Sequence, residues 1–159
     1  MSDWSKHAAR KFLAQESAAR EQTEKEREAK IAEDKRFVIE QGILANRAPE
    51  LWLGLCQQIE TACKEFNSDT GRQLLTCQKM ILNTIEIVRS DTGMKTILTF
   101  ESKTYSIKIR GLATDSAGEV EKLEIKIKPG TDEPAFFDNM SRLANPVNVA
   151  QVLVEQLIS

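Results

Sequence analysis

The sequence predicts an α+β fold: a long charged N-terminal helix, a second amphipathic helix, an antiparallel meander of four to six strands, and a short C-terminal helix packed on the sheet. Three observations lead to this prediction. Helix-forming residues continue without proline up to position 48. From about residue 73 to 128 apolar and polar side chains alternate with a period of two, and after Pro146 the apolar residues follow a helical period.

Residues 1–47 are predicted to form an extended helical arm. Three acid-before-base pairs at i,i+4 support the helix, namely Glu16–Arg20, Glu21–Lys25 and Glu26–Lys30. Between Arg20 and Arg36 the only bulky apolar residue is Ile31, so this stretch has almost nothing to bury. Further on, a group of apolar residues is expected to anchor the helix on the rest of the chain: Phe37, Val38, Ile39, Ile43 and Leu44.

Residues 48–159 are predicted to form the α+β body, which opens with a helix over 49–66. Pro49 suits the first position of a helix, and the turn-forming sequence 67–71 ends it. The apolar residues within this helix share one face: Trp52, Leu55, Cys56, Ile59, Cys63 and Phe66. The sequence therefore predicts a helix that covers the sheet.

The alternating region predicts five strands, over 75–77, 84–89, 96–101, 104–113 and 119–128. In the fourth strand Tyr105, Ile107 and Ile109 are expected on the apolar face, with Ser106, Lys108 and Arg110 on the other. The loop 114–118 is expected to connect the last two strands. The stretch 131–144 is ambiguous and is interpreted as a loop with Phe136 and Phe137 directed inward. Asn145 and Pro146 are typical of a helix start and predict a final helix over 146–158.

Two copies of the tripeptide Asp-Thr-Gly, at 69–71 and 91–93, match the active-site motif of aspartic proteases. That chemistry requires two carboxylates from separate lobes that share one proton. Only 22 residues separate the copies, too few to form a lobe, so both are interpreted as turns. His7 is the only histidine and has no candidate nucleophile beside it. The sequence predicts a protein that is not an enzyme.

Other binding classes lack their usual signals. No glycine-rich phosphate loop is present, and the three cysteines have neither zinc-site nor Cys-x-x-Cys spacing, so no cofactor and no metal are expected. The charges are interspersed and sum to −2, which disfavours nucleic acid. The basic residues of the last two strands are interpreted as a solvated face with cross-strand ion pairs. No segment resembles a membrane span or a signal peptide, so a cytoplasmic location is expected.

The strongest candidate for a functional surface is an apolar stripe near the N-terminus, formed by Trp4, Ala8 and Phe12, with Leu13 alongside. An apolar stripe at the end of a charged helix needs a cover. A break that folds the first turns back, the same helix of a second copy, and a different protein are the three alternatives. The breaking signals are weak, which favours a contact in trans, with self-association ahead of a foreign partner.

The sequence thus predicts a non-enzymatic protein-interaction or scaffolding module that acts through its N-terminal helix. The alternative is a small-ligand or lipid-binding domain with an apolar cavity between sheet and helix. A buried cavity above about 300 Å³ would favour this alternative.

Overall fold

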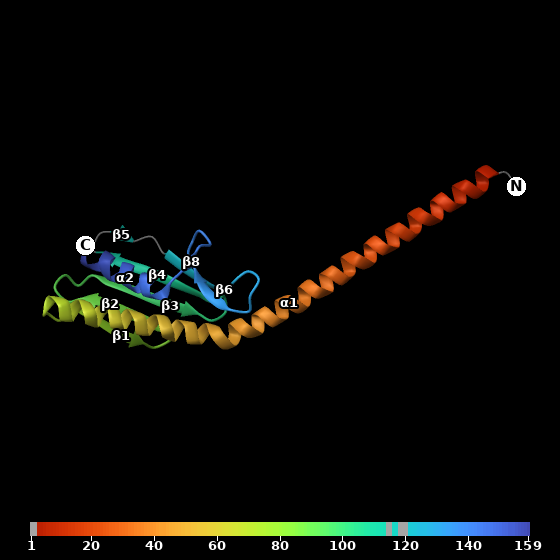
Figure 1. The fold of residues 1–159 in the computed structure, drawn as a ribbon. Coiled ribbons are helices and arrows are strands. Elements are labelled where there is room, and N and C mark those ends of the chain that lie inside the picture. Colours follow the sequence, from red (N-terminus) through yellow and green to blue (C-terminus); the bar gives the residue numbers. More distant parts are fainter. Residues whose placement is uncertain (1–2, 114–115, 118–120) are drawn as a thin grey trace. The chain divides into compact units, whose positions relative to one another are not determined.

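The computed structural model describes residues 3–113, 116–117 and 121–159, with side chains described outside 112–120. The chain divides into two compact units, which we call the N-terminal unit (Met1–Gln41) and the C-terminal unit (Gly42–Ser159). Its elements are drawn in Figure 1 and follow in this order: α1 (Asp3–Thr70), β1 (Leu75–Met80), β2 (Thr84–Arg89), β3 (Lys95–Glu101), β4 (Ser106–Ala113), β5 (Ser116–Ala117), β6 (Glu121–Ile127), β7 (Pro134–Phe137), β8 (Leu143–Ala144) and α2 (Pro146–Ile158). The fold is therefore α+β, as predicted.

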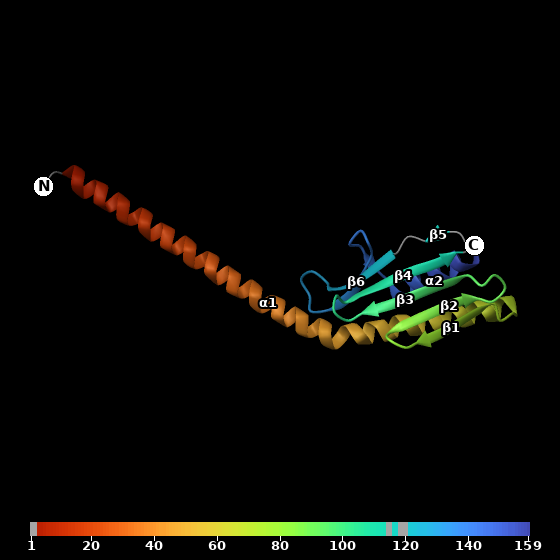
Figure 2. The same ribbon diagram turned by 180° about the vertical axis from the view of Figure 1, so that it is seen from behind.

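The strands form one antiparallel sheet in the order β1-β2-β3-β4-β6-β7-β8, and the short strand β5 pairs with β4. Figure 2 shows the central strands side by side. All five predicted strands are present, although residues 119 and 120 and most of the loop 114–118 lie outside the described residues. The sheet also contains β7 and β8, so it has more strands than the predicted four to six.

The two added strands lie in the stretch 131–144, which the sequence analysis interpreted as a loop. Phe136 is 1% exposed and Phe137 is half-buried, because neighbouring residues of a strand point to opposite faces. The alternation covers only four residues here and begins with Pro134, which made it too short to recognise as a strand. The expectation that both phenylalanines point inward is correct for Phe136 alone.

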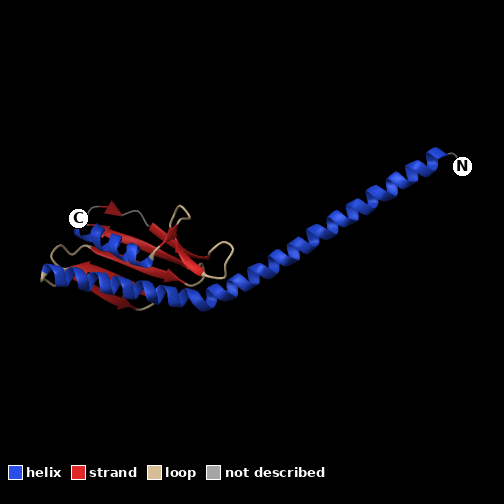
Figure 3. Cartoon of the chain, viewed as in Figure 1, coloured by secondary structure: helices blue, strands red, loops and turns tan. Residues whose placement is uncertain are grey.

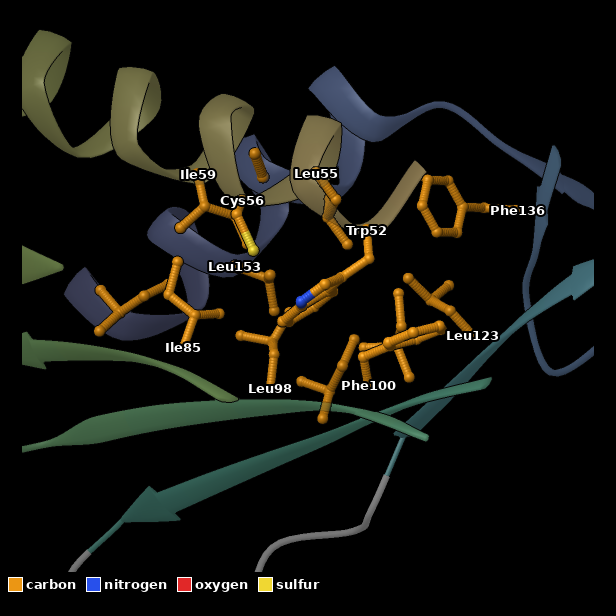
Figure 4. Packing of buried hydrophobic residues seen from close by; sticks show 14 of the residues in the cluster. Trp52, Leu55, Cys56, Ile59, Ile85, Leu98, Phe100, Leu123, Phe136 and Leu153 are labelled. Atoms are coloured by element: carbon orange, nitrogen blue, oxygen red, sulfur yellow. The ribbon is translucent and has the colours of Figure 1, made fainter. Parts of the chain in front are cut away.

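One face of the sheet carries the core of the C-terminal unit. The last part of α1 and the whole of α2 cover this face (Figure 3), and Figure 4 shows their side chains meeting those of the strands. Trp52 of α1 stacks on Phe100 of β3, with ring centroids 5.9 Å apart. The largest side chains that solvent barely reaches come from both layers: Leu55, Ile59, Ile85, Ile87, Leu98, Ile107 and Phe136.

The predicted second amphipathic helix is not a separate element. Residues 49–66 belong to α1, and Pro49 lies inside that helix. Proline has no N–H, so the Ala45 carbonyl loses its helical partner, but both residues are exposed to solvent. Leu44, Ala48 and Trp52 are buried on either side of the proline and hold one continuous helix against the core. Tertiary packing therefore outweighs the local signal for a helix start.

The ends of the helical segments agree better with the sequence. Helix α1 ends at Thr70, and Gly71 follows with φ +68°, a conformation that glycine adopts without steric cost. At the start of α2 the side chain of Asn145 accepts a hydrogen bond from the Val147 N–H at 2.9 Å, and Pro146 occupies the first turn. The start of α2 confirms the predicted cap residues, whereas α1 ends four residues after the predicted end at Phe66.

Strand β4 differs from its prediction at its first residues. Tyr105 precedes the strand with φ +50°, in a turn, but its half-buried side chain packs against the core as expected. Ile107 and Ile109 occupy the buried face of the strand itself. Ser106 was expected to face solvent with Lys108, yet it is fully buried. Its hydroxyl shares a hydrogen bond of 2.6 Å with the Thr104 hydroxyl, which satisfies the buried polar group.

Candidate functional site

The predicted partner-binding residues all lie in the first turns of α1. Trp4 is 78%, Phe12 64% and Leu13 61% exposed, and Ala8 is exposed as well. Trp4, Ala8 and Phe12 follow one another at intervals of four, so they lie along one face of the helix. We call Trp4, Ala8, Phe12 and Leu13 the N-terminal stripe. Helix α1 is continuous from Asp3 onward, so the break needed to fold the first turns back does not occur in the described residues.

A charged stretch follows the N-terminal stripe. Of the three predicted ion pairs, the structure shows Glu16–Arg20, with 2.8 Å between nitrogen and oxygen. Both side chains are largely exposed, so the pair contributes only about 0.2–0.5 kcal/mol to the helix. No residue from Asp3 to Gln41 is buried. The helix of the N-terminal unit thus depends on its own propensity rather than on contacts with a core.

The expected anchor of the N-terminal helix is only partly correct. Leu44 is buried, but Phe37, Val38 and Ile39 are 53–69% exposed. The longest strand has eight residues, which is about 26 Å at 3.3 Å per residue. The buried stripe of α1 runs from Leu44 to Cys63, about 28 Å at 1.5 Å per residue. Within the C-terminal unit, this stripe therefore matches the length of the sheet.

An exposed apolar turn that was not predicted lies between β1 and β2. Met80, Ile81 and Leu82 are 50%, 87% and 84% exposed. Leu82 and Asn83 have φ of +66° and +55°, as in the tight turns of hairpins. Asparagine suits this conformation, whereas leucine at positive φ costs on the order of 1 kcal/mol. The C-terminal unit therefore has its own exposed apolar surface, which any test of the N-terminal stripe must control for.

The second Asp-Thr-Gly copy is a turn, as predicted, whereas Asp69 and Thr70 of the first copy are still helical. The first ends α1, and the second lies between β2 and β3 with Gly93 at φ +73°. Both carboxylate oxygens of Asp91 accept hydrogen bonds from the Arg89 guanidinium, at 2.7 and 3.2 Å. This interaction lowers the pKa of Asp91, whereas an aspartic-protease pair must retain a shared proton. His7 is exposed on α1.

The outer face of the sheet carries mixed charges. Lys108 of β4 pairs with Glu101 of β3 at 2.9 Å, and Lys95 of β3 pairs with Glu86 of β2 at 3.5 Å. The Lys108 contact confirms a cross-strand ion pair for β4, whereas Lys126 of β6 pairs with Glu124 of its own strand at 2.8 Å. The Lys108 ammonium lowers the pKa of Glu101, so that carboxylate stays charged beside the lysine. Alternating signs of this kind are typical of a solvated sheet face.

The space between α1 and the sheet is filled by side chains (Figure 4). Two grooves of the C-terminal unit lie beside Leu143, Ala144 and Asn145. One, of about 280 Å³, lies between α2 and the strands β4 and β6 and is lined by Leu153, Ile109 and Leu123 among others. The other, of about 330 Å³, lies between α1 and β7 and is lined by Leu51 and Phe136 among others. Both are open to solvent, so they differ from the buried cavity that the ligand-binding alternative expects.

Two further properties concern the described part of the chain alone. No helix in it has the length and apolar character that a membrane span requires. Among the same residues, no three or more His, Cys, Asp or Glu side chains are grouped as metal ligands would be. Comparison of the chain with models of protein families, with curated proteins and with solved structures finds no match.

Proposed function

We propose that this chain is a non-enzymatic interaction module and that its N-terminal stripe binds the equivalent helix of a second copy. The observation that carries the proposal is the exposure of Trp4 and Phe12, 78% and 64%, on one face of an uninterrupted helix. Burial of a large apolar side chain contributes about 1.5–3 kcal/mol. Two such residues from each of two copies are enough to drive association.

The charges of the N-terminal unit favour a second copy as the partner. Residues 1–41 contain nine Lys or Arg and nine Asp or Glu, and the two signs alternate along the helix. Two such helices meet without net repulsion, and each offers opposite charges along the length of the other. A partner selected by charge would instead face a strongly basic or acidic surface.

The test is the solution mass of the full chain and of a variant with Trp4→Ser and Phe12→Ser. Sedimentation equilibrium of the parent chain is expected to yield at least twice the 17.9 kDa of one chain. Because a dimer of the variant loses four large side chains, its association constant is expected to fall at least about 100-fold. The thermal midpoint of unfolding should not change, since both residues lie outside the core.

The matched control replaces Ile81 and Leu82 by Ser, two residues of similar exposure in the β1–β2 turn. This variant is expected to keep the mass of the parent chain. The proposal is wrong if the control variant dissociates while the Trp4/Phe12 variant does not. It is also wrong if the Trp4/Phe12 variant unfolds at a lower temperature as a monomer, because the stripe would then belong to the core.

A further inference from the structure

A row of contacts connects the end of α1 with the edge strand β1. The side-chain amide of Asn67 pairs with the backbone of Leu75: its Nδ2 donates to the Leu75 carbonyl at 2.8 Å, and its Oδ1 accepts from the Leu75 N–H at 2.9 Å. Lys79 of the same strand pairs with Glu60 at 3.3 Å. These two contacts set the register between helix and strand.

Cys63 and Cys77 lie between these two contacts. Cys63 precedes Asn67 by four residues, which is about 6 Å along a helix. Cys77 follows Leu75 by two residues, about 6.8 Å along a strand and on the same face. The geometry therefore places one thiol opposite the other, and Cys77 packs against the core cluster to which Cys63 belongs. Cys63 is 3% exposed, whereas Cys77 is half-buried.

We propose that Cys63 and Cys77 form an oxidation site at which hydrogen peroxide produces a reversible disulfide between α1 and β1. This inference concerns the C-terminal unit alone and does not depend on the proposed function. A hydrogen bond from Cys77 lowers the pKa of Cys63 and raises that of Cys77, so Cys63 is the thiol that more readily loses its proton. Thiolates, not thiols, attack peroxides.

The reaction has two steps. The Cys63 thiolate attacks one peroxide oxygen, the O–O bond breaks, and Cys63 becomes a sulfenic acid while the other oxygen leaves as hydroxide and takes up a proton. The Cys77 sulfur then attacks the Cys63 sulfur, the S–O bond breaks, and water leaves with the Cys77 proton. Two thiols and one peroxide thus become one disulfide and two water molecules. The two sulfurs lose two electrons, and the peroxide gains them.

The third cysteine serves as an internal control. Cys56 precedes Cys63 by seven residues on the same helix, a separation of about 10.5 Å that no disulfide can span. Burial raises the pKa of the Cys56 thiol to about 11. Its thiol therefore stays protonated and unreactive at neutral pH.

The experiment treats the full chain with hydrogen peroxide, unfolds it, and counts its free thiols. The count is expected to fall from three to one per chain, with peptide mapping showing a Cys63–Cys77 disulfide and electrophoresis without reductant showing single chains. Dithiothreitol should restore all three thiols. The bond closes a loop of about 15 residues, so the oxidised protein is expected to unfold at a temperature roughly 10 °C higher than the reduced protein.

Three variants test whether the disulfide joins Cys63 to Cys77 and leaves Cys56 free. Cys56→Ala should still lose both of its thiols to the disulfide. Cys63→Ala and Cys77→Ser should form no intramolecular disulfide and should show no rise in unfolding temperature after oxidation. Three free thiols after treatment of the parent chain, a disulfide to Cys56, or disulfides only between chains would each overturn the proposal.

Discussion

Replacing Trp52 by Ala is expected to lower the free energy of unfolding by about 3–5 kcal/mol, the usual cost of removing a large aromatic side chain from a core. Trp52 is 4% exposed and stacks on Phe100 at 5.9 Å, so it joins α1 to the centre of the sheet. The neighbouring side chains come from both α1 and the sheet, which are packed against each other. The cavity that the substitution leaves therefore cannot close. Urea unfolding followed by circular dichroism measures the loss.

The neighbouring residue provides the control for this substitution. Leu53 lies on the same helix and is 54% exposed, so Leu53→Ala should change the free energy of unfolding by no more than about 0.5 kcal/mol. An equal loss for Leu53→Ala and Trp52→Ala would show that α1 does not pack on the sheet by the face described.

Replacing Leu153 by Asp is expected to cost about 3 kcal/mol or more, because the change places an unpaired charge in an apolar contact. Leu153 lies in α2, is 3% exposed, and faces the same core as Trp52 (Figure 4). Val152→Asp is the control, since Val152 lies on the same short helix but is 47% exposed. Thermal melts of both variants make the comparison. Unchanged stability of Leu153→Asp would contradict the packing of α2.

The fold class could be predicted because the apolar residues repeat with regular periods over long stretches. Thr99 separates the buried Leu98 and Phe100 in β3, and Ala150, Leu153, Val154 and Leu157 follow a helical period in α2, so each element has one recognisable buried face. Strand β7 escaped recognition because four residues are too few to establish a period.

The continuity of α1 could not be predicted from the residues around Pro49. Proline is favoured in the first turn of a helix, and the local sequence is consistent with either a new helix or a continued one. The deciding residues are Leu44 and Ala48, which are buried on the same face as Trp52. Leu44, Ala48 and Trp52 are spaced by four residues, and this spacing continues across the proline. It was the signal for a continuous helix that the sequence contained.

The two candidate sites, the N-terminal stripe and the Cys63–Cys77 pair, differ in how well they can be predicted from the sequence. The N-terminal stripe is visible from the spacing of Trp4, Ala8 and Phe12 within one helix. The Cys63–Cys77 pair is not, because its members lie on a helix and a strand whose register depends on Asn67 and Glu60. From the sequence, only Cys56 and Cys63 can be placed relative to each other, because both lie on one helix. That helix keeps the two thiols too far apart for a disulfide.

The most direct test of the N-terminal helix as a binding element is the solution mass of the full chain beside that of a chain of residues 42–159. The shorter chain retains every buried residue of the core, from Leu44 to Leu157. We expect it to melt cooperatively and to sediment as a monomer, whereas the full chain sediments with at least twice the mass of one chain. A full chain that stays monomeric at all concentrations would contradict the account. So would a shorter chain that associates as strongly as the full one, or one that melts without cooperativity.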